Sequence, residues 1–294
     1  MPPSPLQPLW RALQSWLPRR IRPAPPIADR FWRHTLGTHP FLAALPADDQ
    51  TRLRLLSGQF LQEKEFHGAH GLVVNDAMAL AIAAQACLPL LHVVRPDGQP
   101  LAHPLQALDW YDDFVGIVVQ PGAALARREV TDGAGVVHRY QEALAGEAMD
   151  RGPVMLAWTA VAEAPTVAAH GTNVVIHEFV HKMDMRAMPR GQHPDGAPPL
   201  FKGFLDSPSD TAARQRWRTT MQKAYAEFRE AVALAERFGG ERPWLDAYAA
   251  QDPAEFFAVT SEAYFVNRER FTAEFPPLQE LYDGFFRFSA AATP

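Results

Sequence analysis

Residues 173–184 read Asn-Val-Val-Ile-His-Glu-Phe-Val-His-Lys-Met-Asp, which places His177, Glu178 and His181 in the pattern H-E-x-x-H. Helical residues four apart lie on one face with Cβ atoms about 5–6 Å apart, so both imidazoles can bind one Zn²⁺. Glu178 lies about 100° further around the helix than His177. From there its carboxylate can take a proton from the attacking water and pass it to the leaving amine. The stretch therefore predicts the active-site helix of a zinc metallopeptidase.

The apolar residues around this motif argue against a pair of purely structural histidines. Residues 174–176 and 179–180 are all Val, Ile or Phe, so we expect the helix to be largely buried. Buried imidazoles and carboxylates need polar partners, and one metal ion satisfies two histidines and a glutamate together. We therefore expect one Zn²⁺ per chain.

A catalytic zinc site needs a third protein ligand and keeps one position open for water. The extended motif H-E-x-x-H-x-x-G-x-x-H would supply a third histidine, but Asp184 and Ala187 stand where its glycine and histidine would be. The third ligand is then expected to be a glutamate from a later helix. This expectation defines a metallopeptidase of the Glu-zincin type.

Two glutamates of a helix predicted over residues 253–267 are candidates for that ligand. Glu255 and Glu262 are seven residues apart and share one face, among aromatic residues that indicate burial. Glu255 also has a structural interpretation, because it follows Asp252 by three residues and completes a capping box. Glu262 also has a structural interpretation, since its carboxylate can bind the ring nitrogen of a ligating histidine that does not face the metal. The residues alone leave both open.

The remaining elements are predicted from periodicity and turn signals. A proline-rich segment with short helices, one of them over 6–16, is predicted over residues 1–45, and a zinc metallopeptidase domain over residues 46–294. Within 47–94 the pattern is helical, with a second helix beginning at Asn75 or Asp76. Strands are predicted over 114–119, 136–143 and 154–161, and helices over 172–186, 210–238, 253–267 and 277–290. The sum is an α+β fold.

Composition limits the classes of partner. The chain has 294 residues, 47% hydrophobic and 21% charged, with a net charge of −5, which disfavours binding to nucleic acid or to an anionic membrane. No apolar stretch is long enough to span a bilayer and no secretory signal begins the sequence, so a cytoplasmic protein is expected. The single cysteine, Cys87, lies in an apolar run and is predicted to be a buried core residue.

Several segments together resemble the family of zinc peptidases typified by Mlc titration factor A. The resemblance covers about residues 50–285, most of the chain. The segments that carry it are 60–68, 82–88, 146–158, 173–184, 195–200 and 252–262.

The resemblance implies a zincin-like fold, with helices around a small mixed sheet, similar to the catalytic domain of anthrax lethal factor. In that relative a tyrosine precedes the glutamate ligand by seven residues, within a Glu-Phe-Phe-Ala context. Tyr248 and Glu255 have this spacing here, and Glu255 begins the same tetrapeptide. The likeness thus favours Glu255 as the third ligand and assigns Tyr248 to oxyanion stabilisation. It also implies that residues 152–161 form the sheet edge that pairs with substrate.

The function implied is a zinc-dependent, aminopeptidase-like hydrolase acting on a peptide or protein substrate, with Glu178 as general base. The alternative is a zinc-bearing regulator that sequesters a transcriptional repressor of the Mlc type, with hydrolysis incidental. Asp184 is expected either to orient a histidine or to cap the helix end. His67, His70 and His193 lie in predicted loops and are expected at the surface.

Overall fold

The computed structural model describes residues 24–122, 124–131, 137–144, 146–187 and 193–287, so the helix predicted over 6–16 lies outside the described part. The N-terminal half contains, in order, α2 (Asp29–Thr38), α3 (Pro40–Ala43), α4 (Ala47–Glu63), β1 (Glu65–Gly68), α5 (Asp76–Cys87), η2 (Leu88–Leu90), η3 (Pro104–Tyr111), β2 (Gly116–Gln120), β3 (Ala124–Thr131), β4 (Val137–Leu144), β5 (Gly146–Ala148), β6 (Val154–Ala157), α6 (Trp158–Val167) and η4 (Ala168–His170). The C-terminal half contains α7 (Val174–Met185), η5 (Phe204–Asp206), α8 (Asp210–Phe238), η6 (Ala247–Ala250), α9 (Pro253–Val266), α10 (Arg268–Glu274) and α11 (Pro276–Phe286).

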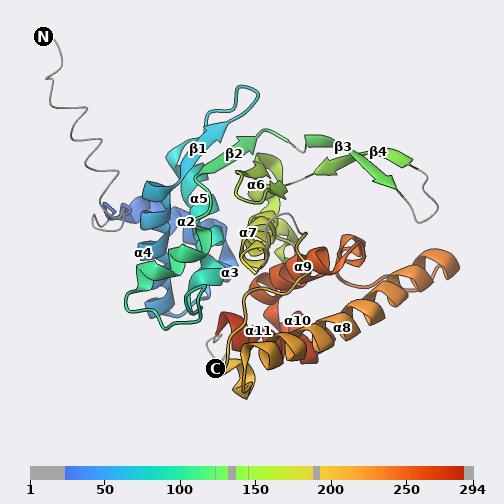
Figure 1. Cartoon of the computed structure of the whole chain (residues 1–294). Coiled ribbons are helices and arrows are strands. Elements are labelled where there is room, and N and C mark those ends of the chain that lie inside the picture. The colour runs from blue at the N-terminus through green and yellow to red at the C-terminus, as the bar shows by residue number, and fades with distance from the viewer. Residues whose placement is uncertain (1–23, 123, 132–136, 145, 188–192, 288–294) are drawn as a thin grey trace, which may run out of the picture.

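A mixed four-stranded sheet has the order β1-β2-β6-β5. The three strands β1, β2 and β6 run parallel, whereas β5 pairs antiparallel with β6, and β1 and β5 form the two edges. Strands β3 and β4 form a separate antiparallel hairpin, which projects from the body beyond the sheet (Figure 1). A small mixed sheet among helices agrees with the predicted α+β class.

Helix α7 runs through the middle of the molecule, between the sheet with its N-terminal helices and the C-terminal helices (Figure 1). The Phe179 ring of α7 packs against those of Phe60, Tyr111 and Phe114, with centroids 5.6, 5.0 and 5.9 Å away. On the other side α7 contacts α9. Aromatic pairs of this kind stabilise a core more than the surface area that they bury would predict. Helix α7 is therefore held rigidly from both sides.

The N-terminal helices α2 and α3 pack into the same core as the rest. Trp32, Leu42 and Leu45 are buried in one continuous cluster with residues of α4, α5 and α7. Cys87, fully buried at the end of α5, is a core residue as predicted. The described residues contain no helix that is both long and apolar enough to span a lipid bilayer.

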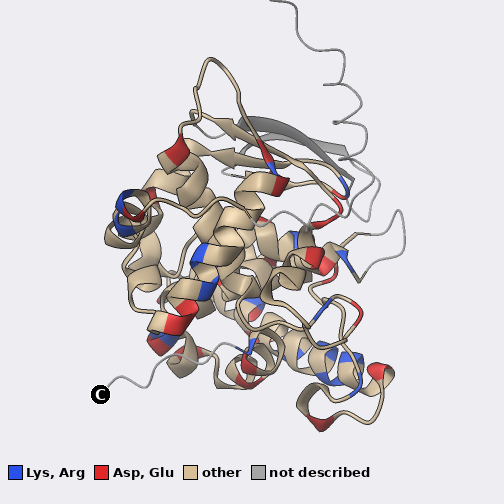
Figure 2. Ribbon diagram, turned by 90° about the vertical axis from the view of Figure 1, so that its left-hand side faces the viewer, with Lys and Arg blue, Asp and Glu red and all other residues tan. Residues whose placement is uncertain are grey.

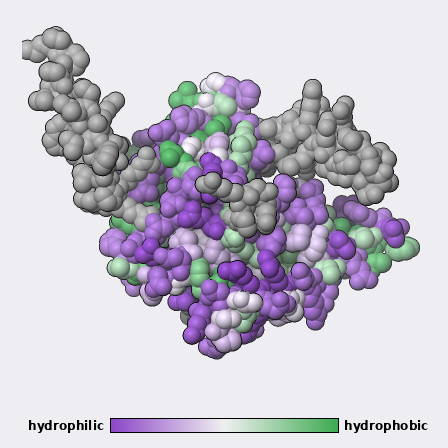
Figure 3. Space-filling view, in the orientation of Figure 1, coloured by the Kyte–Doolittle hydropathy of each residue, from purple (hydrophilic) through white to green (hydrophobic). Residues whose placement is uncertain are grey.

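Charges of both signs are interspersed over the ribbon, in agreement with the small net charge (Figure 2). The face seen in Figure 3 is mainly hydrophilic. Hydrophobic residues reach the surface at the outer end of α8, where Leu234 and Phe238 are 50% and 77% exposed.

The helices of the C-terminal half begin and end close to their predicted limits. Helix α8 stops at Gly239, whose φ of 66° is the left-handed conformation that glycine adopts readily. The strands were predicted less well. The segment 154–161 is a strand only to Ala157, because the alanine-rich residues that follow form α6. Strands β1, β3 and β5 and helix α6 were not predicted.

The predicted sheet edge at residues 152–161 is wrong. Strand β6 lies inside the sheet, with β2 on one side and β5 on the other. Its continuous apolar run from Val154 to Ala157 is typical of a strand that is covered on all sides. The edge strand on that side of the sheet is instead β5, a three-residue strand that contains Gly146 and Glu147, and β1 forms the opposite edge.

Candidate metal centre

Helix α7 begins at a buried asparagine. The Asn173 side-chain oxygen accepts a hydrogen bond from Ile176 N–H at 3.0 Å, which satisfies one of the free amides of the first turn. Its side-chain nitrogen donates to Gln85 Oε1 at 2.7 Å, which connects α7 to α5. The backbone N–H of Asn173 donates to Glu262 Oε2 of α9. The start of the helix is therefore positioned by both neighbouring helices.

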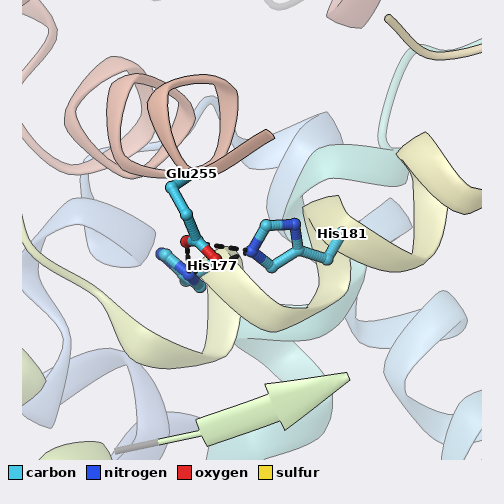
Figure 4. A group of neighbouring side chains, drawn as sticks. All are labelled: His177, His181 and Glu255. Carbon is cyan, nitrogen blue, oxygen red and sulfur yellow. Dashed lines mark hydrogen bonds and ion pairs between the residues drawn. The ribbon is translucent and has the colours of Figure 1, made fainter. Parts of the chain in front are cut away.

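Helix α9 begins as the sequence predicts. Asp252 is its N-cap and accepts from the backbone N–H groups of Ala254 and Glu255 at 2.8 and 3.0 Å, with Pro253 in the first turn. The Glu255 side chain points toward the two histidines of α7 (Figure 4). One carboxylate is thus directed from the first turn of α9 onto α7.

His177, His181 and Glu255 bring three ligand atoms together (Figure 4). The Nε2 atoms of the two histidines are 3.1 Å apart, and Glu255 Oε2 lies 3.0 Å from His177 Nε2 and 3.3 Å from His181 Nε2. Ligand atoms around a tetrahedral zinc ion with bonds of about 2.0–2.1 Å lie about 3.3 Å apart. The spacing of the three atoms therefore fits a zinc ion.

Glu262 occupies a different place from Glu255. Its Oε1 lies 2.7 Å from His177 Nδ1, on the opposite side of the ring from the shared ligand atoms. A proton on Nδ1, held by this carboxylate, leaves the lone pair of His177 Nε2 directed at the site. Within the described residues, the buried Nδ1 of His181 has no hydrogen-bond partner. The two imidazoles are therefore supported unequally.

The charges of this cluster perturb one another. Burial alone lowers the pKa of His177, but Glu262 and Glu255 raise it well above its usual value. Burial raises the pKa of Glu255, but hydrogen bonds to His177 and His181 outweigh it and lower the pKa. Burial also raises the pKa of Glu262, which His177 lowers only in part. Such opposing effects are typical of functional clusters.

Glu178 faces the sheet rather than α9. Its side chain is 4% exposed, and burial raises its pKa to about 7 although His177 and His181 lower it. It packs directly on Gly146 of the edge strand, where a Cβ atom would lie 2.4 Å from Glu178 Oε1. A glycine at this position is therefore required for the strand to approach the carboxylate.

The other predicted residues lie at varying distances from this cluster. Tyr248, in η6, is half-buried and its ring centroid lies 6.2 Å from that of His177. Asp184 is fully buried and accepts from Gly196 N–H at 2.8 Å, so it holds a loop, and within the described part of the chain no hydrogen bond joins it to either histidine. The three histidines predicted at the surface, His67, His70 and His193, are exposed.

Gly196 joins the two helices that carry the ligand atoms. Its N–H binds Asp184 of α7, and its carbonyl accepts from Trp217 Nε1 of α8 at 2.7 Å. Its φ is 72°, and a Cβ atom there would lie 2.4 Å from the carbonyl oxygen of Pro253, at the start of α9. The loop therefore packs tightly between α7 and the first turn of α9.

Sequence reasoning missed three residues on the sheet side of α7: Lys182, Asp113 and Gly146. Lys182 is fully buried and pairs with Asp113 at 2.8 Å. A lysine one turn after Glu178, in a helix that the sequence predicts to be largely buried, was a signal that a buried partner exists. Nothing in the sequence indicated which acid it would be, or that Gly146 would meet Glu178.

Comparison with known proteins gives a consistent family. The model of the glucose-regulated metallo-peptidase M90 family matches residues 13–287. A protein named Mlc titration factor A from Salmonella arizonae is 31% identical over 260 residues, which cover 88% of this chain and 91% of that protein. The protein of the same name from Yersinia pestis is 29% identical over 256 residues, 87% of this chain and 83% of that protein.

Proposed function

The chain belongs to the glucose-regulated metallo-peptidase M90 family, and from this premise we propose that it is a zincin-like peptidase that hydrolyses peptide bonds with one zinc ion held by His177, His181 and Glu255. The observation that carries the proposal is the convergence of three ligand atoms within 3.3 Å of one another. Neutral imidazole nitrogens and a carboxylate oxygen at this spacing can all bind a single cation. Nitrogen and oxygen donors of this kind suit zinc.

Different side chains of the protein have different roles in the proposed hydrolysis. A zinc ion bound by His177, His181 and Glu255 would supply Lewis-acid polarisation of the scissile carbonyl and would lower the pKa of water. Glu178 takes the proton of the attacking water and delivers it to the leaving amine. Tyr248 donates a hydrogen bond to the developing oxyanion. Glu262 keeps the His177 ring in its orientation through Nδ1.

The substrate pairs with the edge strand β5 as an extended peptide. Met149 N–H bonds to Pro153 O, and the alternation of an antiparallel pair then directs the N–H and C=O groups of Gly146 and Ala148 away from β6. Backbone pairing of this kind gives affinity with little side-chain selectivity. An aminopeptidase-like activity on peptides with an accessible end agrees with such a short edge.

The decisive experiment compares Glu178→Gln with wild type for bound zinc and for peptide cleavage. Zinc content, measured by elemental analysis, is expected to stay near one per chain, while the cleavage rate falls by about a hundredfold or more, since the general base is lost. Glu163→Gln, an exposed glutamate of α6, is the matched control. Wild-type protein that takes up no zinc, or a variant that cleaves normally, would contradict the proposal.

A second candidate function follows from the names of the relatives, which describe titration of Mlc. The chain would then bind a cytoplasmic transcriptional repressor of the Mlc type, with hydrolysis incidental. Purified Glu178→Gln protein separates the two functions. Repressor binding that survives in this variant, measured by calorimetry, would show that binding is independent of catalysis.

A further inference from the structure

We propose that Lys182, paired with Asp113, is a positioning residue that holds the edge strand β5 in place for an extended substrate. The inference rests on the proposed peptidase function and names how the substrate strand is oriented. It is carried by the contacts of one buried lysine on the side of α7 that faces the sheet.

Lys182 Nζ bridges two parts of the chain. It lies 2.8 Å from Asp113 Oδ2 and donates to the carbonyl oxygen of Met149, also at 2.8 Å. It also lies 4.6 Å from the centre of the Phe114 ring. The Lys182 side chain is fully buried and that of Asp113 is 11% exposed, so the charge is neutralised within the protein. Burying a lysine is costly without such partners, which indicates a specific role for the pair.

Met149 is the residue that follows β5 directly. Its carbonyl oxygen also accepts from Gly152 N–H at 3.1 Å, within the turn that leads to β6. Through this carbonyl oxygen, Lys182 therefore fixes the position of the turn at one end of the edge strand. At the other end, Gly146 packs on Glu178.

Glu178 and Lys182 are four residues apart on α7 and lie on the same face. The edge strand thus runs along this face, with the carboxylate beneath its beginning and the ammonium group beneath its end. Ala148, whose N–H and C=O point outward, immediately precedes the tethered carbonyl. A substrate that extends along β5 past Gly146 therefore depends on the tether, whereas one that reaches only the reacting carbonyl does not.

A neighbouring ion pair offers a matched control. Arg186, one turn after Lys182, pairs with Asp112 at 2.7 Å, and this pair also joins α7 to the loop before β2. The Arg186 and Asp112 side chains are 24% and 55% exposed, and among the residues that the structure describes neither forms a hydrogen bond or ion pair with β5. Loss of this pair changes the charge of the helix but leaves the strand tether intact.

The test compares Lys182→Met/Asp113→Asn, which removes both buried charges together, with Arg186→Met and wild type. Each protein is assayed with a quenched-fluorescent decapeptide and with alanine p-nitroanilide, which is too short to reach Ala148. Zinc affinity is measured by competition with a chelator, and hydrogen exchange is followed in the amides of residues 146–149.

In the double variant, KM for the decapeptide is expected to rise about tenfold and kcat to change less than about threefold, the pattern of lost uniform binding. KM for the anilide and the zinc affinity should stay near wild type, and exchange at residues 146–149 should accelerate. Arg186→Met should show none of these changes.

Three outcomes would overturn the inference: equal effects on both substrates, loss of zinc, or unchanged exchange in β5. The first two would assign Lys182 to general stability or to the metal centre, and the third would show that the tether does not hold the strand. Wild-type protein with neither zinc nor activity would instead be a failure of the proposed function, and the exchange measurement would still decide whether the tether exists.

Discussion

Helix α7 presents two faces of different construction. Toward α9, His177 and His181 meet two carboxylates, Glu255 and Glu262, through side-chain contacts of 2.7–3.3 Å. Toward the sheet, Glu178 and Lys182 meet the backbone of β5, at Gly146 and at Met149. The first face is covered by side chains of α9, and the second is covered by the main chain of an edge strand.

This difference indicates a division of tasks between the faces. Two imidazole nitrogens and a carboxylate oxygen that converge on one point are suited to holding a cation, which displaces the protons of the histidines. A strand with outward backbone groups is suited to holding a peptide. Substitutions on the α9 side should therefore change metal affinity, and substitutions on the sheet side should change substrate binding and turnover.

The largest effect is expected from Glu255→Ala. A zinc-binding free energy of about 10–16 kcal/mol, divided among three protein ligands and one water, assigns about 3 kcal/mol to each ligand. Loss of Glu255 should therefore lower the zinc affinity by about a hundredfold or more. Chelator competition measures this loss, with the exposed Glu269→Gln as control. A variant that binds zinc as tightly as wild type would remove Glu255 from the ligand set.

Tyr248→Phe tests whether a residue near the α9-facing side of α7 contributes to catalysis. The ring lies near His177, but the proposal gives its hydroxyl a role only in the transition state. Loss of an oxyanion donor typically lowers kcat by about a hundredfold or more. Zinc affinity should not change, and steady-state kinetics of the zinc-loaded protein give the answer. A variant with normal kcat would reduce Tyr248 to a packing residue.

Glu262→Gln is expected to have a smaller effect. Its carboxylate touches Nδ1 of His177 and not the shared ligand atoms, and loss of such support costs about ten- to a hundredfold in metal affinity. The same chelator titration compares it with Glu255→Ala. If Glu262→Gln loses more zinc than Glu255→Ala, the roles of the two glutamates are reversed.

The smallest effect concerns the sheet side and pH. Burial lowers the pKa of Lys64 from 10.5 to about 8, because the desolvated ammonium group loses its hydration, and the nearby acids Glu63 and Asp113 only partly offset this effect. The folded state therefore releases this proton near pH 8, while the unfolded chain keeps it until about pH 10.5. The unfolded state binds more protons in this window, so stability should rise with pH.

Urea unfolding of wild type and Lys64→Met at several pH values isolates this contribution. The stability of wild type relative to the variant should increase by about 1 kcal/mol between pH 8 and pH 9. A difference between the two proteins that does not depend on pH would show that Lys64 titrates normally in the fold.

The sequence predicted the α9-facing side of the site better than the sheet-facing side, for a physical reason. Spacing along a helix defines which residues share a face, so His177, His181 and the two glutamates could be nominated, and Asp252 signalled where α9 begins. The distinction between Glu255 and Glu262 depends on the relative position of two helices, which spacing does not contain. Only the resemblance to a known family favoured Glu255.

The sheet-facing side depends on contacts between segments far apart in the chain. Strand β5 is three residues long, with too little pattern to recognise. Residues 152–161 were assigned to a sheet edge from the family resemblance, although the apolar run at 154–157 is typical of a strand with neighbours on both sides. Lys182 and Asp113 are separated by 69 positions along the chain, so no local signal could pair them.

Gly196 shows how remote packing can govern the metal centre. With a φ of 72° and 2.4 Å between a would-be Cβ and the Pro253 carbonyl oxygen, the loop leaves no room for a methyl group. Any larger residue there would collide with the start of α9. Helix α9 would then have to move away from α7, and the Glu255 carboxylate would move away from His177 and His181. The distance between the three proposed ligand atoms is thus limited by a residue that supplies none of them.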